Sequence, residues 1–86
     1  MKKQQQAKTK PVAEVRYGNV RAAIWRNDNA ESSWYNVTFE RSYRDEDEYK
    51  SSQSFGRDDL LLVAKVANEA HTLINNMQRE ERISQE

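Results

Sequence analysis

The sequence predicts an α+β fold, in which a four-stranded antiparallel meander is followed by one long C-terminal helix. Two observations predict it. Between Val12 and Phe55, apolar and polar residues alternate in runs that short polar segments separate, which is typical of strands with one buried face. From Leu60 to Met77 the apolar residues recur every three or four positions, which is typical of a helix with one buried face.

The chain of 86 residues is long enough for one small domain. Residues 1–11 have no large apolar side chain after Met1, and Lys, Gln and Thr dominate them, so we expect a disordered basic arm. A single β4α domain should span residues 12–80, and the polar residues 81–86 should form a frayed tail. Small domains without disulfides are commonly stabilised by association, and this chain has no cysteine, so we expect a homodimer.

The first two strands are joined at the dipeptide "GN", positions 18–19. Both residue types tolerate the positive φ of a two-residue hairpin turn. This turn pairs Tyr17 with Val20 and Arg16 with Arg21, so that the apolar residues of both strands share one face. A slip of one residue would turn them to the wrong face, which makes the register well defined.

A polar loop then leads to a third strand over residues 34–43. Pairing Ile24 with Tyr35 continues the apolar face of the first two strands. The same register sets Trp25 opposite Trp34 on the other face. The two tryptophans should therefore be neighbours on the face that the helix leaves uncovered, which we call the outer face.

The fourth strand follows a charged turn. Residues 27–33 are the polar loop before the third strand, and residues 44–48, "RDEDE", should form the turn after it. The run 49–55 then alternates as a strand, with Tyr49 opposite Tyr43. This register places Lys50 on the outer face.

The helix should begin after Gly56, with Asp58 as its N-cap. Its apolar stripe is wider than one side of a small sheet needs, which indicates a partner helix. The stripe consists of Leu60, Leu62, Val63, Ala64, Val66, Ala67, Ala70, Leu73, Ile74 and Met77.

The outer face combines flat aromatic side chains with cations, which suits single-stranded nucleic acid. Bases stack on indole rings, and Lys and Arg neutralise phosphates. Arg16 and Arg21 repel each other across the first hairpin unless an anion lies over them. The candidate nucleic-acid-binding residues are Arg16, Arg21, Trp25, Trp34, Asn36 and Lys50, with Lys8 and Lys10 of the basic arm.

A structural interpretation of the same tryptophans is open. Together with Val12 they can form a cross-strand apolar cluster that only stabilises a thin sheet. The charge distribution favours nucleic acid, because residues 1–26 hold seven Lys and Arg against one Glu. The net charge of zero and the nine acidic residues in 27–59 favour a protein-interaction module instead.

The sequence argues against several other functions. His71 is the one histidine and has no obvious Ser, Cys or second His partner, so we interpret it as structural. The acidic residues 45–48 do not have the glycine and ligand spacing of a calcium loop. We expect no enzyme activity, metal, cofactor, small-molecule substrate or membrane partner. The absence of cysteine and of an apolar leader is typical of a cytoplasmic protein.

The order of elements over residues 12–80 resembles the single-stranded-DNA-binding transcriptional coactivators of the positive-cofactor-four type and, more distantly, the plant Whirly proteins. The pattern "AAIW...WYNVTF...SFGRDDLL" also looks like that of short uncharacterised bacterial proteins. The resemblance to the coactivators implies a dimer formed by paired helices and a sheet whose outer face binds unpaired strands. It places four residues at the helix contact, namely Leu62, Val66, Ala70 and Leu73.

Two hypotheses follow. The first is a single-stranded nucleic-acid-binding protein that prefers DNA to RNA, has low sequence specificity and acts in transcription or replication. The second is a protein-interaction module that does not bind nucleic acid.

Overall fold

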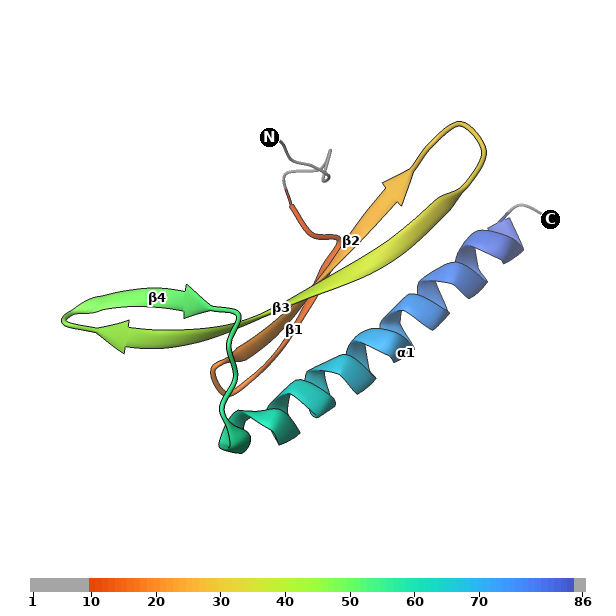
Figure 1. Ribbon diagram of the computed structural model, residues 1–86. Helices are drawn as coiled ribbons and strands as arrows, with labels where there is room; N and C mark the ends of the chain where they lie inside the picture. The colour runs from red at the N-terminus through yellow and green to blue at the C-terminus, as the bar shows by residue number, and fades with distance from the viewer. Residues whose placement is uncertain (1–9, 85–86) are drawn as a thin grey trace.

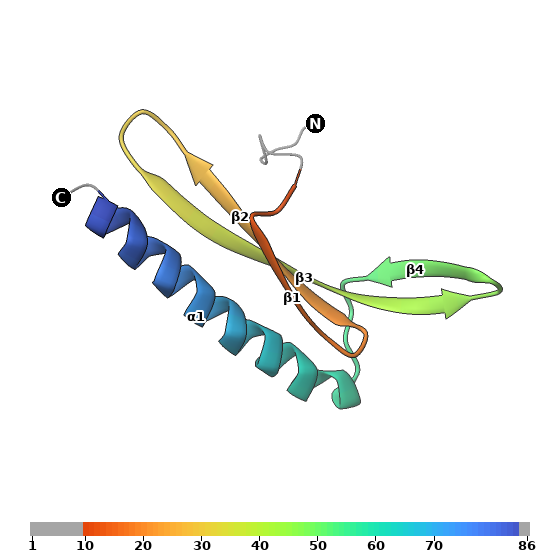
Figure 2. The same ribbon diagram turned by 180° about the vertical axis from the view of Figure 1, so that it is seen from behind.

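The structure, a computed structural model, describes residues 10–84 and confirms the predicted fold class. Four strands form one antiparallel sheet in the order β1-β2-β3-β4. The helix α1 packs against one face of the sheet, chiefly on β1 and β2, and the β3–β4 hairpin projects away from it (Figures 1 and 2). The elements are β1 Ala13–Tyr17, β2 Val20–Asp28, β3 Ser33–Asp45, β4 Glu48–Ser52, the short 3-10 turn η1 Arg57–Asp59 and α1 Leu60–Ser84.

The first hairpin has the predicted register. Tyr17 pairs with Val20 and Arg16 with Arg21 across the turn. Gly18 has a φ of +60°, a conformation that side chains with a Cβ rarely adopt. The prediction from the "GN" dipeptide is therefore confirmed.

The β2–β3 register differs from the prediction by two residues. Ile24 pairs with Val37 instead of Tyr35. The cause is a shorter loop, because both strands continue into the polar segment that we expected to form the loop. The Asn29 side chain accepts hydrogen bonds from the backbone N–H groups of Glu31 and Ser32, both at 2.9 Å, and so closes a tight loop.

An even shift keeps every side chain on its predicted face. The expected direct pairing of the two tryptophans is nevertheless wrong. Trp25 lies opposite Asn36, and Trp34 lies opposite Asn27. The indoles are diagonal neighbours on the outer face.

The β3–β4 register differs by one residue, which does exchange the faces. The turn consists of Glu46 and Asp47 alone, with φ values of 52° and 69°. Tyr49 therefore pairs with Arg44 and joins the outer face, while Lys50 pairs with Tyr43 on the helix side. The prediction that Lys50 lies on the outer face is wrong, because the turn is tighter than its five charged residues indicated.

The core lies between α1 and the centre of the sheet, as the alternation predicted. Its fully buried residues are Val20, Ala22, Ile24, Val66 and Ala70. Leu62 and Leu73 pack against this cluster. Val66 and Ala70, two of the four residues expected at a dimer contact, are thus buried within the chain, and Leu62 and Leu73 are partly buried beside them. This side of the helix covers β1 and β2, and dimerisation itself stays a prediction.

The two ends of the helix also differ from the prediction. At the start, the Asp59 carboxylate accepts the Gly56 N–H at 2.9 Å, while Asp58 forms an ion pair with Arg57, so Asp58 is not the cap. At the other end, α1 continues to Ser84 instead of fraying from residue 81. Residues 1–9 of the expected basic arm, including Lys8, lie outside the described residues.

Candidate nucleic-acid interface

The outer face carries five of the predicted binding residues. Arg16 comes from β1, Arg21 and Trp25 come from β2, and Trp34 and Asn36 come from β3. Lys50 lies on the helix side, where its ammonium group is 3.1 Å from the Asp45 carboxylate.

The two tryptophans and two asparagines form a compact group, which we call the indole patch: Trp25, Asn27, Trp34 and Asn36. The Asn27 amide donates a hydrogen bond to the Asn36 amide oxygen between the two indoles. Trp25 is half-buried, and its indole N–H donates to the Thr38 hydroxyl at 2.9 Å. Trp34 is 46% exposed. The patch therefore has one anchored indole and one available indole, with amide groups between them.

Arg21 is held by two carboxylates rather than left free for an anion. Its guanidinium group lies 3.1 Å from Glu14 and 2.8 Å from Glu40. Burial lowers the pKa of Arg21, but the hydrogen bonds and charges of Glu14 and Glu40 outweigh burial and raise it above its ordinary value. These carboxylates offset the repulsion from Arg16, which was the reason for expecting an anion at the arginine pair. The two-residue shift explains the difference, because it brings Glu40 opposite Arg21.

The basic N-terminal segment joins the fold beside the indole patch. The Val12 N–H donates to the Ile24 carbonyl at 2.8 Å, so the chain enters the sheet next to Trp25. Lys10, two residues earlier, is exposed. Among the described residues, the cations that could contact a phosphate near the patch are thus Lys10 and the exposed Arg16.

A second aromatic group lies at the far end of the outer face, and the sequence interpretation missed it. Tyr49 is 76% exposed, and the Arg44 guanidinium lies over its ring at 5.7 Å from the centroid. Had the turn been predicted as Glu46 and Asp47 alone, the pairing of Tyr49 with Arg44 would have followed from it. Residues other than glycine seldom adopt positive φ, so the sequence favoured a wider turn.

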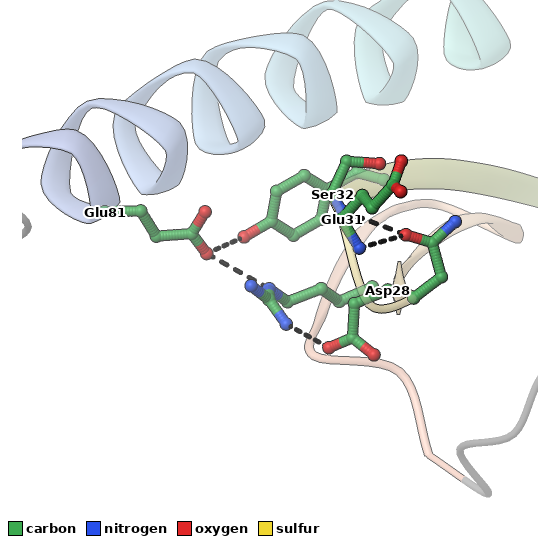
Figure 3. Close-up of polar contacts among 7 residues, drawn as sticks. Asp28, Glu31, Ser32 and Glu81 are labelled. Atoms are coloured by element: carbon green, nitrogen blue, oxygen red, sulfur yellow. Dashed lines mark hydrogen bonds and ion pairs between the residues drawn. The ribbon is translucent and has the colours of Figure 1, made fainter.

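On the helix side of β2 and β3, a polar cluster joins the strands to the end of α1 (Figure 3). Glu81 of α1 accepts hydrogen bonds from the Tyr35 hydroxyl at 2.5 Å and from Arg26 Nε at 3.1 Å. Arg26 also pairs with Asp28 at 2.8 Å. Since Tyr35 follows Trp34 and Arg26 follows Trp25, this cluster fixes the strands that carry the patch.

The pKa values of the cluster follow from these contacts. The Tyr35 hydrogen bond lowers the pKa of Glu81, burial opposes this effect, and Arg26 lowers the pKa further. Burial raises the pKa of Tyr35, and so does its hydrogen bond to Glu81, while Arg26 opposes the change. The cluster therefore favours an ionised Glu81 and a neutral Tyr35.

His71 and the acidic residues 45–48 are the other positions that the sequence raised as possible sites. His71 is exposed on α1. Residues 10–84 contain no group of three His, Cys, Asp or Glu side chains that could hold a metal ion. Over the same residues, no helix combines the length and the apolar character needed to cross a membrane.

Comparisons with models of protein families, with curated proteins and with solved structures find no match to this chain.

Proposed function

We propose that this protein binds single-stranded nucleic acid through the outer face, with low sequence specificity and a preference for DNA over RNA. The observation that carries the proposal is the exposed indole of Trp34, framed by amide groups and next to the entry of the basic segment. A base stacks on Trp34 with a contribution of about 1–3 kcal/mol. Lys8, Lys10 and Arg16 neutralise phosphates of the same strand.

The amides of Asn27 and Asn36 suit hydrogen bonding to base edges. Since they bond each other, such contacts need one of them to turn, and they add little discrimination. This supports weak sequence specificity. The preference for DNA and a role in transcription or replication rest on the resemblance to the coactivators, and the absence of cysteine supports a cytoplasmic location.

The test is a fluorescence titration with a fifteen-nucleotide oligothymidine at low and high salt. Wild-type protein should bind at low salt, and its indole emission should be quenched. Binding should weaken with salt by a slope of about 0.7 per phosphate contacted. Trp34→Ala should bind at least about fivefold more weakly, since one stacked base is lost.

A matched control is His71→Ala, because His71 is exposed on α1 on the other side of the sheet. This variant should bind like the wild type. The proposal is wrong if the wild-type protein does not bind at low salt, or if Trp34→Ala and His71→Ala bind equally well.

The second candidate is a protein-interaction module, and the pairing of Arg21 with Glu14 and Glu40 favours it. Together with Arg16, these three side chains give the centre of the outer face a net charge of zero. Val12 and Trp34 are 45% and 46% exposed and supply apolar area beside it. On this hypothesis, oligonucleotides leave the fluorescence unchanged, while a protein partner is captured by the wild type and lost with Trp34→Ala.

We also propose that the chain forms a homodimer, through a side of α1 other than the one first expected. Leu60, Ala64 and Ala67 follow one another at helical spacing, with Leu60 53% exposed and Ala64 exposed. The small alanines permit close approach of a second helix.

A further inference from the structure

At the end of the outer face remote from the indole patch, Tyr49 is the most exposed aromatic residue that the structure describes, at 76%. A ring this exposed contributes little to the core. One side of the ring nevertheless has a partner, because the Arg44 guanidinium lies 5.7 Å from the ring centroid. The other side of the ring is free to stack.

We propose that Tyr49 and Arg44 form a second base-stacking site, so that one nucleic-acid strand is held along β3 between this site and Trp34. This inference rests on the proposed function. It adds a second contact between protein and nucleic acid, and it aligns the bound nucleic-acid strand with β3. Both tyrosine rings and guanidinium planes stack on bases, and Arg44 adds a charge for a phosphate.

The acidic turn beside Tyr49 must be reconciled with an anionic ligand. Glu48 pairs with Asp45, which places both on the helix side, and Lys50 neutralises Asp45 there. Asp47 is the carboxylate that contacts Arg44, at 3.5 Å, and its side chain is 98% exposed. Such exposed ion pairs contribute little free energy, so a phosphate oxygen can replace Asp47 at Arg44.

The spacing of the two stacking sites suits a strand rather than a single nucleotide. Trp34 and Arg44 are ten positions apart on β3, which corresponds to about 33 Å. A stacked single strand rises about 3.4 Å per nucleotide, so roughly ten nucleotides cover this distance. The outer-face residues of β3 between them are polar, and the one carboxylate among them, Glu40, is paired with Arg21, which it shares with Glu14. A fifteen-nucleotide strand reaches both sites.

The first experiment compares two tyrosines of the same hairpin. Tyr49 is on the outer face, whereas Tyr43 is on the helix side, 37% exposed and paired with Arg41 at 5.5 Å. Affinity for fifteen-nucleotide oligothymidine should fall at least about fivefold in Tyr49→Ala and remain within twofold of wild type in Tyr43→Ala. Tyr49→Phe, which retains a ring, should bind like the wild type.

A second experiment reports the position directly. In a background with Trp25→Phe and Trp34→Phe, a Tyr49→Trp substitution places the sole indole at the proposed site. The oligonucleotide should quench this indole and leave the indole of a matched Tyr43→Trp variant unchanged. Circular dichroism checks that each variant is folded, and Tyr49 is exposed enough for its substitution to leave the fold intact.

The outcomes separate this inference from the proposed function. If the wild type binds, and Tyr49→Ala binds as tightly as Tyr43→Ala, the second site is wrong while the nucleic-acid function stands. Quenching at position 43 but not at position 49 would also overturn the second site. If the wild type does not bind at low salt, both proposals fail.

Discussion

At the scale of single residues, a register shift of two positions changes the partner that a side chain meets on the next strand. The sequence predicts that Arg21 binds an anion, but in the structure Glu14 and Glu40 lie 3.1 and 2.8 Å from its guanidinium group. Lys50 is likewise neutralised by Asp45. Besides the exposed Arg16 and Arg44, the aromatic Trp34 and Tyr49 stay available on the outer face, so stacking rather than charge dominates the proposed contact.

Gly18 gives a prediction at this scale. Gly18→Ala should lower the free energy of unfolding by about 1–2 kcal/mol, because alanine is strained at a φ of +60°. The added Cβ would also lie 3.3 Å from Leu62 Cδ1, which is closer than an ordinary contact. Urea unfolding followed by circular dichroism measures the change.

The control is Gly56→Ala, at a glycine with a φ of −82° whose Cβ would have its nearest neighbour at 3.6 Å. This variant should unfold close to the wild-type midpoint. Equal destabilisation by the two substitutions would show that the turn at Gly18 does not require glycine.

At the scale of the elements, α1 is attached to the sheet at three points along its length. Directly before its first residue, Asp59 of η1 lies 3.6 Å from Arg41 of β3. At its middle, Val66 and Ala70 pack on β1 and β2. Near its end, Glu81 accepts hydrogen bonds from Tyr35 and Arg26. The last contact holds the β2–β3 hairpin against the helix. The indole patch lies on the other face of this hairpin, so the same contact fixes its position.

The Glu81 contact gives a prediction about pH. The pKa of Glu81 is lower in the folded protein than its ordinary value of 4.5, so its ionised form stabilises the fold above pH 4.5. This stabilisation is lost as the pH falls through the lowered pKa. Glu81→Gln should therefore lower the urea midpoint at pH 7, and the difference between the two proteins should shrink as the pH falls below 4.5.

The adjacent Glu80 supplies the control, because it is exposed on α1. Glu80→Gln should have little effect on the midpoint at either pH. A constant difference between Glu81→Gln and the wild type from pH 7 to pH 3 would mean that the charge of Glu81 does not stabilise the helix end.

At the scale of the whole molecule, few residues are fully buried. The largest of them are Ile24, Val20 and Val66, and the dimensions of 52 × 31 × 18 Å describe an elongated shape. The β3–β4 hairpin projects from the part of the sheet that α1 covers (Figure 1). Small domains with so limited a core commonly gain stability by association, which is the physical basis of the proposed homodimer.

The dimer surface can be tested by sedimentation equilibrium. Wild-type protein should sediment as a dimer, and Ala64→Glu should shift it towards the monomer, because a charge would be buried between the helices. Asn76→Glu is the control, since Asn76 is exposed on the opposite side of α1 by helical spacing. A monomeric wild type, or equal behaviour of both variants, would contradict the proposed surface.

Much of the fold could be predicted because alternation and helical spacing report which face of each element is buried. Ala22, Ile24 and Val66 lie in the core as their positions in these patterns indicate. Register is harder to predict, because loop closure depends on contacts that alternation does not encode. The Asn29 hydrogen bonds shorten one loop, and the positive φ values at Glu46 and Asp47 tighten the other.

The sequence by itself determined the order of the elements, the turn at Gly18 and the placement of Trp25 and Trp34 on the face away from the helix. These depend on local periodicity, and an even change of register leaves them intact. Only the tertiary structure decided which cations stay unpaired and that Tyr49 replaces Lys50 on the outer face. It also decided that the helix continues past residue 81, where Glu81 bonds to Tyr35 and Arg26. Each of these depends on the partner that a side chain meets across the sheet, and a shift of one or two residues changes that partner.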